Sequence, residues 1–188
     1  MPPARVLLYV ATAGALALMA RSLLRGPVPL WVSGVALAAF PRRALVEISW
    51  RSFELDPSAP KALPAGLSYA GRLAKKYGTS TAQAEAMIQR MTETAARDGL
   101  DFRFDRIQSG NTFEAHQLLH FAAEKGLQDA LKERFFRAYF TEGEPIGDAE
   151  ALVRLAAEVG LDADEARSAL TTGLFAADVR ADEDEARA

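Results

Sequence analysis

The spacing of hydrophobic and polar residues changes from alternation to a helical repeat shortly after residue 56. Residues 45–55 alternate apolar and polar positions, are rich in β-branched and aromatic side chains, and are followed by Pro57, which predicts a strand. Trp50 and Phe53 in this strand are expected to lie in the core. After residue 66 the apolar residues recur at the spacing of amphipathic helices. The pattern therefore predicts a mainly α structure with one strand near its start.

Capping residues and glycines divide the region after the strand into separate helices. Residues 58–65 contain two prolines and predict a loop, while residues 100–106 predict either a short strand or an extended loop. Asn111 or Thr112 is expected to cap the helix that begins there. The expected helices are 67–77, 80–98, 111–125, 127–141, 148–159 and 162–172, with a last helical segment over 171–188.

The charge is distributed unevenly along the chain. Residues 1–43 contain five arginines and no acidic residue, whereas residues 44–188 contain 17 Lys and Arg against 25 Asp and Glu, a net charge of −8. Binding to a phosphate backbone depends on clustered positive charge. The acidic body therefore argues against a nucleic-acid-binding function, and no nucleic-acid partner is expected.

None of the 188 residues is a cysteine, which excludes a disulfide, a thiolate zinc site and a thiol nucleophile. The sequence also contains no glycine-rich phosphate loop, no nucleophile elbow and no pair of carboxylates in a catalytic pattern. We therefore expect no catalytic residue in this chain.

An apolar run begins at Val6 and ends at Ala20, flanked by arginines. Its 15 residues are fewer than the roughly 20 that span a bilayer, and Ala15-Leu16-Ala17 suits a signal-peptide cleavage site. A second apolar run, 26–40, is interrupted by prolines and glycine and makes a poor membrane helix. A secretory signal, a membrane anchor and a segment without a targeting role all stay open.

His116 and His120 are the only histidines, and they lie four residues apart on one face of an expected helix. That spacing suits two ligands of a helical metal site. No Glu lies between them in the required pattern and no third ligand is evident, so packing against aromatic neighbours is the favoured interpretation. Neither a metal nor another cofactor is expected.

Four aromatic residues, Phe135, Phe136, Tyr139 and Phe140, lie close together in one expected helix. They either belong to the core, which their helical spacing favours, or line a hydrophobic groove for a peptide. The acidic run 182–185 is expected to be a solvated helix face or a frayed end.

Three motifs are specific in combination: Trp50-Arg51-Ser52-Phe53-Glu54-Leu55-Asp56-Pro57, Asn111-Thr112-x-x-Ala115-His116-x-Leu118-Leu119-His120 and Asp178-Val179-Arg180-Ala181-Asp182-Glu183. Together they resemble the DsbA-like oxidoreductases, and the FrnE-type branch in particular, over residues 35–186. Members of that family use a Cys-Pro-Trp-Cys motif, which this chain lacks, and a C-terminal cis-proline loop, before which it stops. The resemblance implies the second strand and the helical insert of a DsbA-like thioredoxin fold, which is α/β in the intact family.

The resemblance divides the chain into an apolar N-terminal segment, 1–40, and a partial DsbA-like domain, 41–188. The segment has about the length of the family's first strand, redox motif and first helix, but not their residues. An altered reading frame or a mis-set start is our interpretation. Only residues 6–10 offer a neighbour for the strand at 45–55, so bare strand edges and marginal stability are expected.

The resemblance and the missing motifs imply a relative of the dithiol–disulfide oxidoreductases that is inactive, truncated or frame-altered, and we expect it to be cytoplasmic. The alternative is a non-catalytic helical binding module, exported or tethered to a membrane through residues 6–20. The family alone implies a polypeptide substrate. The candidate substrate-groove residues are His116, His120, Phe136 and Tyr139, and the second motif places the histidines in the helical insert.

Overall fold

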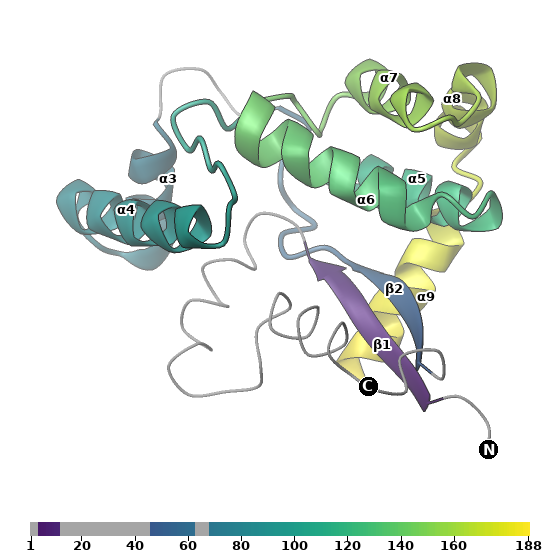
Figure 1. Cartoon of the computed structure of the whole chain (residues 1–188), viewed down its shortest axis with the longest axis horizontal. Coiled ribbons are helices and arrows are strands. Elements are labelled where there is room, and N and C mark those ends of the chain that lie inside the picture. Colours follow the sequence, from purple (N-terminus) through teal and green to yellow (C-terminus); the bar gives the residue numbers. More distant parts are fainter. Residues whose placement is uncertain (1–3, 12–45, 63–67) are drawn as a thin grey trace. The chain divides into compact units, whose positions relative to one another are not determined.

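The chain folds into two compact units, whose elements Figure 1 labels. The sheet unit comprises Met1–Asp56 and Ala177–Ala188, and the helical unit comprises Pro57–Ala176. The second apolar run and the domain boundary expected at residue 40 lie outside the described residues. The residues that this computed structural model describes are 4–11, 46–62 and 68–188.

The sheet unit contains two parallel strands, β1 (Ala4–Ala11) and β2 (Val46–Phe53). Their register runs from Ala4 opposite Val46 to Ala11 opposite Phe53. The strand predicted over residues 45–55 is therefore confirmed, and its predicted neighbour at residues 6–10 lies within β1.

The first part of the apolar run that begins at Val6 is a strand, since β1 covers the run as far as Ala11. Residues 12–20 of the run lie outside the described residues. Within the part of the chain that the structure describes, none of the helices combines the length and the hydropathy needed to cross a bilayer.

Trp50 and Phe53 are half-buried, which corrects the expectation that both are core residues. The ring of Phe53 meets a cation: the guanidinium carbon of Arg187 lies 5.6 Å from its centroid. Arg187 is the last residue of α9 (Ala176–Arg187). Phe53 therefore joins the strand to α9 through an interaction that tolerates partial exposure.

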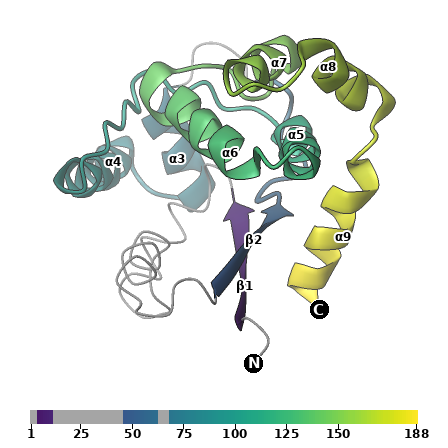
Figure 2. The same ribbon diagram turned by 45° about the vertical axis from the view of Figure 1, so that its right-hand side comes forward.

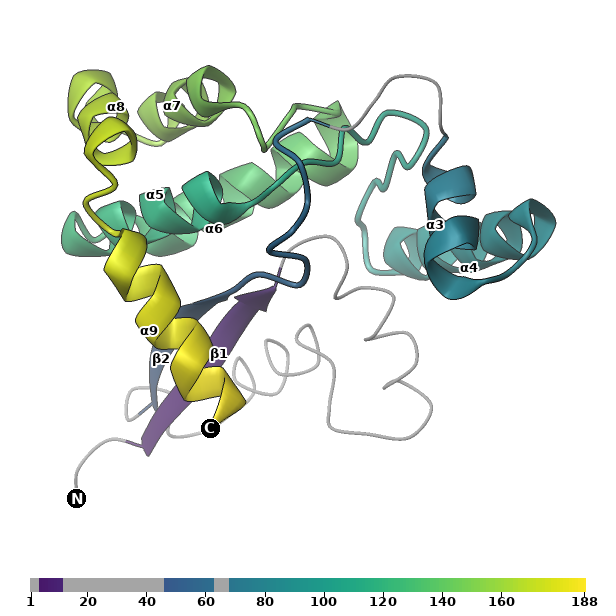
Figure 3. The same ribbon diagram turned by 180° about the vertical axis from the view of Figure 1, so that it is seen from behind.

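The acidic run 182–185 corrects a second expectation, because its first two carboxylates are buried against β2. The amide of Ser52 donates to Asp182 at 2.7 Å, and the amide of Glu54 donates to Glu183 at 2.9 Å. Figure 3 shows α9 beside β2. The edge of β2 that was expected to be bare is thus occupied at Ser52, and Glu183 binds the residue directly after the strand.

The helical unit confirms the six helices expected from the caps and glycine stops. Ser80 and Gln83 form a reciprocal capping box, and Asp148 and Asp162 accept hydrogen bonds from the first turns of their helices. The helices are α3 (Tyr69–Tyr77), α4 (Thr81–Arg97), α5 (Phe113–Glu124), α6 (Gln128–Arg137), α7 (Ala149–Glu158) and α8 (Ala163–Thr172).

Two local details differ from the expectation. The helix predicted over residues 127–141 changes after Arg137 into a π-helical turn, η2 (Ala138–Glu142). The strand alternative for residues 100–106 is wrong, because these residues form a loop with a turn. The amide of Arg103 in this loop donates to the carbonyl of Phe140 in η2 at 2.7 Å.

The core of the helical unit lies among α5, α6, α7 and α8, which pack against one another (Figure 2). Phe135, Tyr139 and Phe140 are buried, so the core assignment of these aromatic residues is confirmed, while Phe136 is half-buried. Fully buried leucines fill the centre, namely Leu118, Leu131, Leu152 and Leu155.

Candidate functional site

The four groove candidates lie on α5 and at the junction of α6 with η2. His116 is fully buried and Tyr139 is 2% exposed, whereas His120 and Phe136 are half-buried. Phe136 and Tyr139 both contact Phe140, with ring centroids 6.3 and 4.9 Å from its centroid. The structure therefore unites the two aromatic candidates around Phe140 and leaves His120 and Phe136 with exposed surface.

The histidine pair does not extend into a metal site in the part of the chain that is described. Within residues 4–11, 46–62 and 68–188, no three His, Cys, Asp or Glu side chains are grouped so that they could hold a metal ion.

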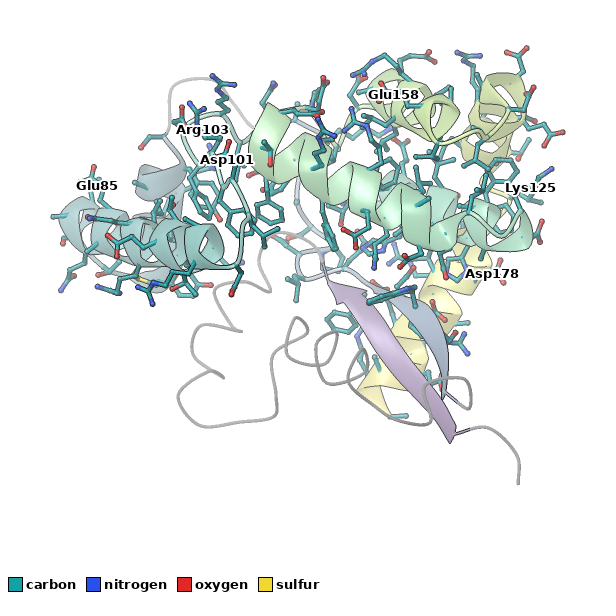
Figure 4. All side chains as sticks on the ribbon, viewed as in Figure 1. Glu85, Asp101, Arg103, Lys125, Glu158 and Asp178 are labelled. Atoms are coloured by element: carbon teal, nitrogen blue, oxygen red, sulfur yellow. The ribbon has the colours of Figure 1, made fainter. Side chains whose placement is uncertain are left out.

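The π-helical turn η2 is fixed by the loop that joins α4 to α5. In addition to the Arg103 amide, the Thr141 hydroxyl donates to the carbonyl of Asp101 at 2.8 Å, and the Gln108 amide donates to the carbonyl of Gly143 at 2.7 Å. Figure 4 labels Asp101 and Arg103 on this loop. These contacts hold η2 in the π-helical geometry, which is rare in proteins and frequently lies at functional sites.

Aromatic rings from three parts of the helical unit meet beside η2. Phe102 stacks on Phe140 with a centroid distance of 4.5 Å and an interplanar angle of 21°. Phe104 meets Phe140 edge-on at 6.5 Å, and Tyr69 of α3 lies 5.1 Å from Phe104. We call Tyr69, Phe102, Phe104, Phe136, Tyr139 and Phe140 the aromatic cluster.

Tyr139 carries one of the two phenol hydroxyls of the aromatic cluster, and Tyr69 carries the other. Its hydroxyl lies 3.1 Å from the hydroxyl of Ser109, which accepts a 3.3 Å hydrogen bond from Arg72. Burial raises the pKa of Tyr139 strongly, and Tyr69 adds to this rise, while the Ser109 hydrogen bond and Arg72 oppose it. Tyr139 is therefore a neutral phenol at physiological pH and cannot act there as a base.

Tyr139 should make the protein sensitive to alkali. The unfolded phenol ionises above about pH 10, but the folded phenol stays protonated there. The contribution of Tyr139 to the free energy of unfolding is therefore fully present below about pH 10 and is lost as the pH rises toward the pKa of the folded phenol. Tyr139→Phe should cost roughly 1 kcal/mol at pH 7, through the lost hydrogen bond, and should flatten this alkaline loss. Urea unfolding at pH 7 and at about pH 11 checks this, since an ordinary phenol is ionised at the higher pH. Tyr77→Phe at an exposed position is the control. An alkaline loss unchanged by Tyr139→Phe would contradict it.

A second cluster of contacts encloses the backbone of Lys61. A Cβ atom at Gly110 or at Gly147 would collide with the Lys61 carbonyl oxygen. The amide of Asn111 donates to Pro60 at 2.9 Å, and the Lys61 ammonium donates to Glu114 at 2.6 Å. The segment after the first motif is thereby fixed to the start of the second motif.

These contacts explain what sequence reasoning missed. Gly110 and Gly147 each lie next to a helix start and read as ordinary loop glycines, because nothing in their neighbours identifies the distant carbonyl that requires them. The described side chains thus build a rigid helical scaffold with an apolar cluster. They hold neither a metal-ligand group nor a sulfur nucleophile.

Comparison with known proteins identifies the scaffold. The family model of the DSBA-like thioredoxin domain matches residues 35–188. The uncharacterized protein YwbO of Bacillus subtilis is 35% identical over 132 residues, which are 69% of this chain and 60% of that protein's length. The crystal structure of a probable DsbA oxidoreductase from Streptomyces coelicolor is similar with a TM-score of 0.81 and 38% identity, over 97% of this chain and 74% of that one. The chain therefore belongs to the DsbA-like thioredoxin domain family.

Proposed function

We propose that this chain is a DsbA-like family protein that does not itself carry out dithiol–disulfide exchange. The observation that carries the proposal is the absence of cysteine from all 188 residues. Exchange proceeds by attack of a thiolate on a disulfide sulfur through a mixed disulfide. A serine hydroxyl or a histidine ring cannot form that intermediate, so no described side chain replaces the thiol.

The test is whether the purified chain accelerates the formation of disulfides in a reduced, unfolded substrate protein. In a glutathione buffer the rate should equal the rate without the protein. A cysteine-containing member of the same family serves as the positive control. An acceleration proportional to the amount of this chain would overturn the proposal.

We also propose that the chain derives from the FrnE-type branch, and that its residues between β1 and residue 35 are read in an altered frame. The motif from Trp50 to Pro57 supports the branch, and the family match that begins at residue 35 supports the altered frame. The nucleotide sequence tests this directly. Codons for Cys-Pro-Trp-Cys should appear in another frame before codon 35, and their absence from every frame would refute the idea.

A non-catalytic binding module for extended apolar polypeptides is the second candidate. It is supported by the exposure at the aromatic cluster: Phe102 and Phe136 are half-buried and both contact the buried Phe140, and Leu100 is 50% exposed. His116 and His120 of α5 stay groove candidates through the family resemblance alone.

Fluorescence anisotropy tests this second candidate function, because it measures the binding of a labelled, permanently reduced polypeptide to the chain. Phe136→Glu should weaken binding by about tenfold or more, because a charge would enter an apolar contact. Leu174→Glu is the matched control, since Leu174 is a 64% exposed apolar residue between α8 and α9. Equal binding by both variants would exclude the aromatic cluster as the binding surface.

A further inference from the structure

Four consecutive acidic residues of α9 lie in two contrasting environments. Asp182 and Glu183 are 2% and 1% exposed, whereas Asp184 and Glu185 are exposed to solvent. Ionised carboxylates are rarely buried unless they are paired or hydrogen-bonded. The burial of the first two therefore requires specific partners within the sheet unit.

Those partners are the amide of Ser52, on the edge of β2, and the amide of Glu54, the residue directly after β2. The amides of Ser52 and Glu54 lie two residues apart, so they point to the same side of the chain, roughly 7 Å from each other. Asp182 accepts from the first at 2.7 Å and Glu183 from the second at 2.9 Å. The carboxylates thus take the places that carbonyl groups of a neighbouring strand would occupy.

Arginine side chains compensate the buried charges. Arg51 of β2 contacts Asp182 at 2.8 Å, and Arg180 of α9 contacts both Glu54 and Glu183 at 2.7 Å. Burial alone would raise the pKa of Glu183, but the Glu54 amide and Arg180 outweigh burial and lower it. Glu183 is therefore ionised at neutral pH and accepts charge-assisted hydrogen bonds, which are shorter and stronger than neutral ones.

We propose that Asp182 and Glu183 form a strand-edge cap that keeps β2 from pairing with the β2 strand of a second copy of this chain. An uncapped edge presents unpaired amides and carbonyls, which are a template for another strand. Two copies related by a two-fold axis would place the same edge against itself in antiparallel pairing. The cap goes beyond the proposed function, because it depends on α9 and β2 and not on thiol chemistry.

The test compares two double substitutions in the same run of α9. Asp182→Ala with Glu183→Ala removes both acceptors, and Asp184→Ala with Glu185→Ala removes the two exposed neighbours. Alanine is the most favourable residue in a helix, so neither change should disfavour α9 itself. Light scattering over a concentration series reports the oligomeric state, and hydrogen exchange reports the amides of Ser52 and Glu54.

The cap predicts a concentration-dependent dimer for the Asp182/Glu183 variant and a monomer for the control. At concentrations where the variant is monomeric, the amides of Ser52 and Glu54 should exchange about tenfold faster or more, while those of α5 stay unchanged. A variant that stays monomeric at every concentration, with α5 still protected, overturns the proposal. So does a control that dimerises equally.

Arg180→Ala provides a second variant that keeps both acceptors, in case the double substitution yields no soluble protein. It removes the cation shared by Glu54 and Glu183 and should weaken the cap only partly. We expect the amide of Glu54 to exchange faster than that of Ser52, and a larger dimer fraction than in the Asp184/Glu185 control. Unchanged exchange at Glu54 would overturn the cap.

Discussion

Phe140→Ala is expected to lower the free energy of unfolding by about 3 to 5 kcal/mol, the usual range for removing a buried phenylalanine ring. The ring is 6% exposed, so the substitution leaves a cavity in a closed part of the core. A loss of this size approaches the total stability of many domains, so part of the variant should be unfolded at 25 °C. The rings that lose their contact are those of Phe102, Phe104, Phe136 and Tyr139.

Urea denaturation followed by far-ultraviolet circular dichroism measures this loss, with Phe136→Ala as the control. Phe136 lies on the same helical segment but is half-buried, and its ring is 6.3 Å from Phe140. Its removal should cost about 1 to 2 kcal/mol, because part of the vacated space is open to water. Equal losses for the two variants would show that the aromatic cluster is not centred on Phe140.

Gly147→Ala is expected to lower the free energy of unfolding by about 2 to 3 kcal/mol, within the range for overpacking a closed site. The added Cβ would collide with the carbonyl oxygen of Lys61, and it would lie 3.1 Å from the Cα of Gly110. Backbone atoms cannot swing aside as a flexible side chain can. The segment around Lys61 must therefore move away from the turn that precedes α7.

Gly126→Ala is the matched control for this substitution. Gly126 has a φ of +70° but nothing within 4 Å of an added Cβ, so alanine meets backbone strain without a collision. That strain costs about 1 kcal/mol. If Gly147→Ala costs no more than Gly126→Ala in the same denaturation experiment, the close packing around Lys61 does not contribute to stability.

Local signals predict the helices of this chain well, because the residues that stop and start them act within a few positions. Ser80 and Gln83 form the capping box that their spacing indicates, and Asp148 and Asp162 cap the helices that follow them. The strand at residues 45–55 is equally clear, since alternation and β-branched residues agree there.

Contacts between distant residues set the limit of such predictions. A hydropathy pattern treats Asp182 and Glu183 as solvated acids, because the amides that bury them lie about 130 positions earlier in the chain. The same limit applies to Gly147. A side chain is excluded there by the carbonyl of Lys61, which lies far away in the sequence. The π-helical turn at Ala138–Glu142 likewise depends on a loop that precedes it by some 35 residues.

The groove candidates also show the difference between local signals, which the sequence reveals, and contacts between distant residues, which it does not. Helical spacing correctly assigns Tyr139 to the core, but it cannot distinguish a completely buried residue from one at the margin, such as Phe136. That distinction depends on which rings from α3 and from the loop before α5 cover each position. Spacing gives no information on those rings.

We propose that this member of the DsbA-like family performs no dithiol–disulfide exchange, because none of its 188 residues is a cysteine. Reduction of insulin disulfides by dithiothreitol, followed by turbidity, tests it most directly. A cysteine-containing family member serves as the positive control, and a sample treated with iodoacetamide detects contaminating thiol enzymes. Because the chain has no thiol, the rate should equal the uncatalysed rate at every concentration of this chain. A rate that rises with the chain's concentration and is unchanged by iodoacetamide treatment would show that the chain does catalyse disulfide exchange.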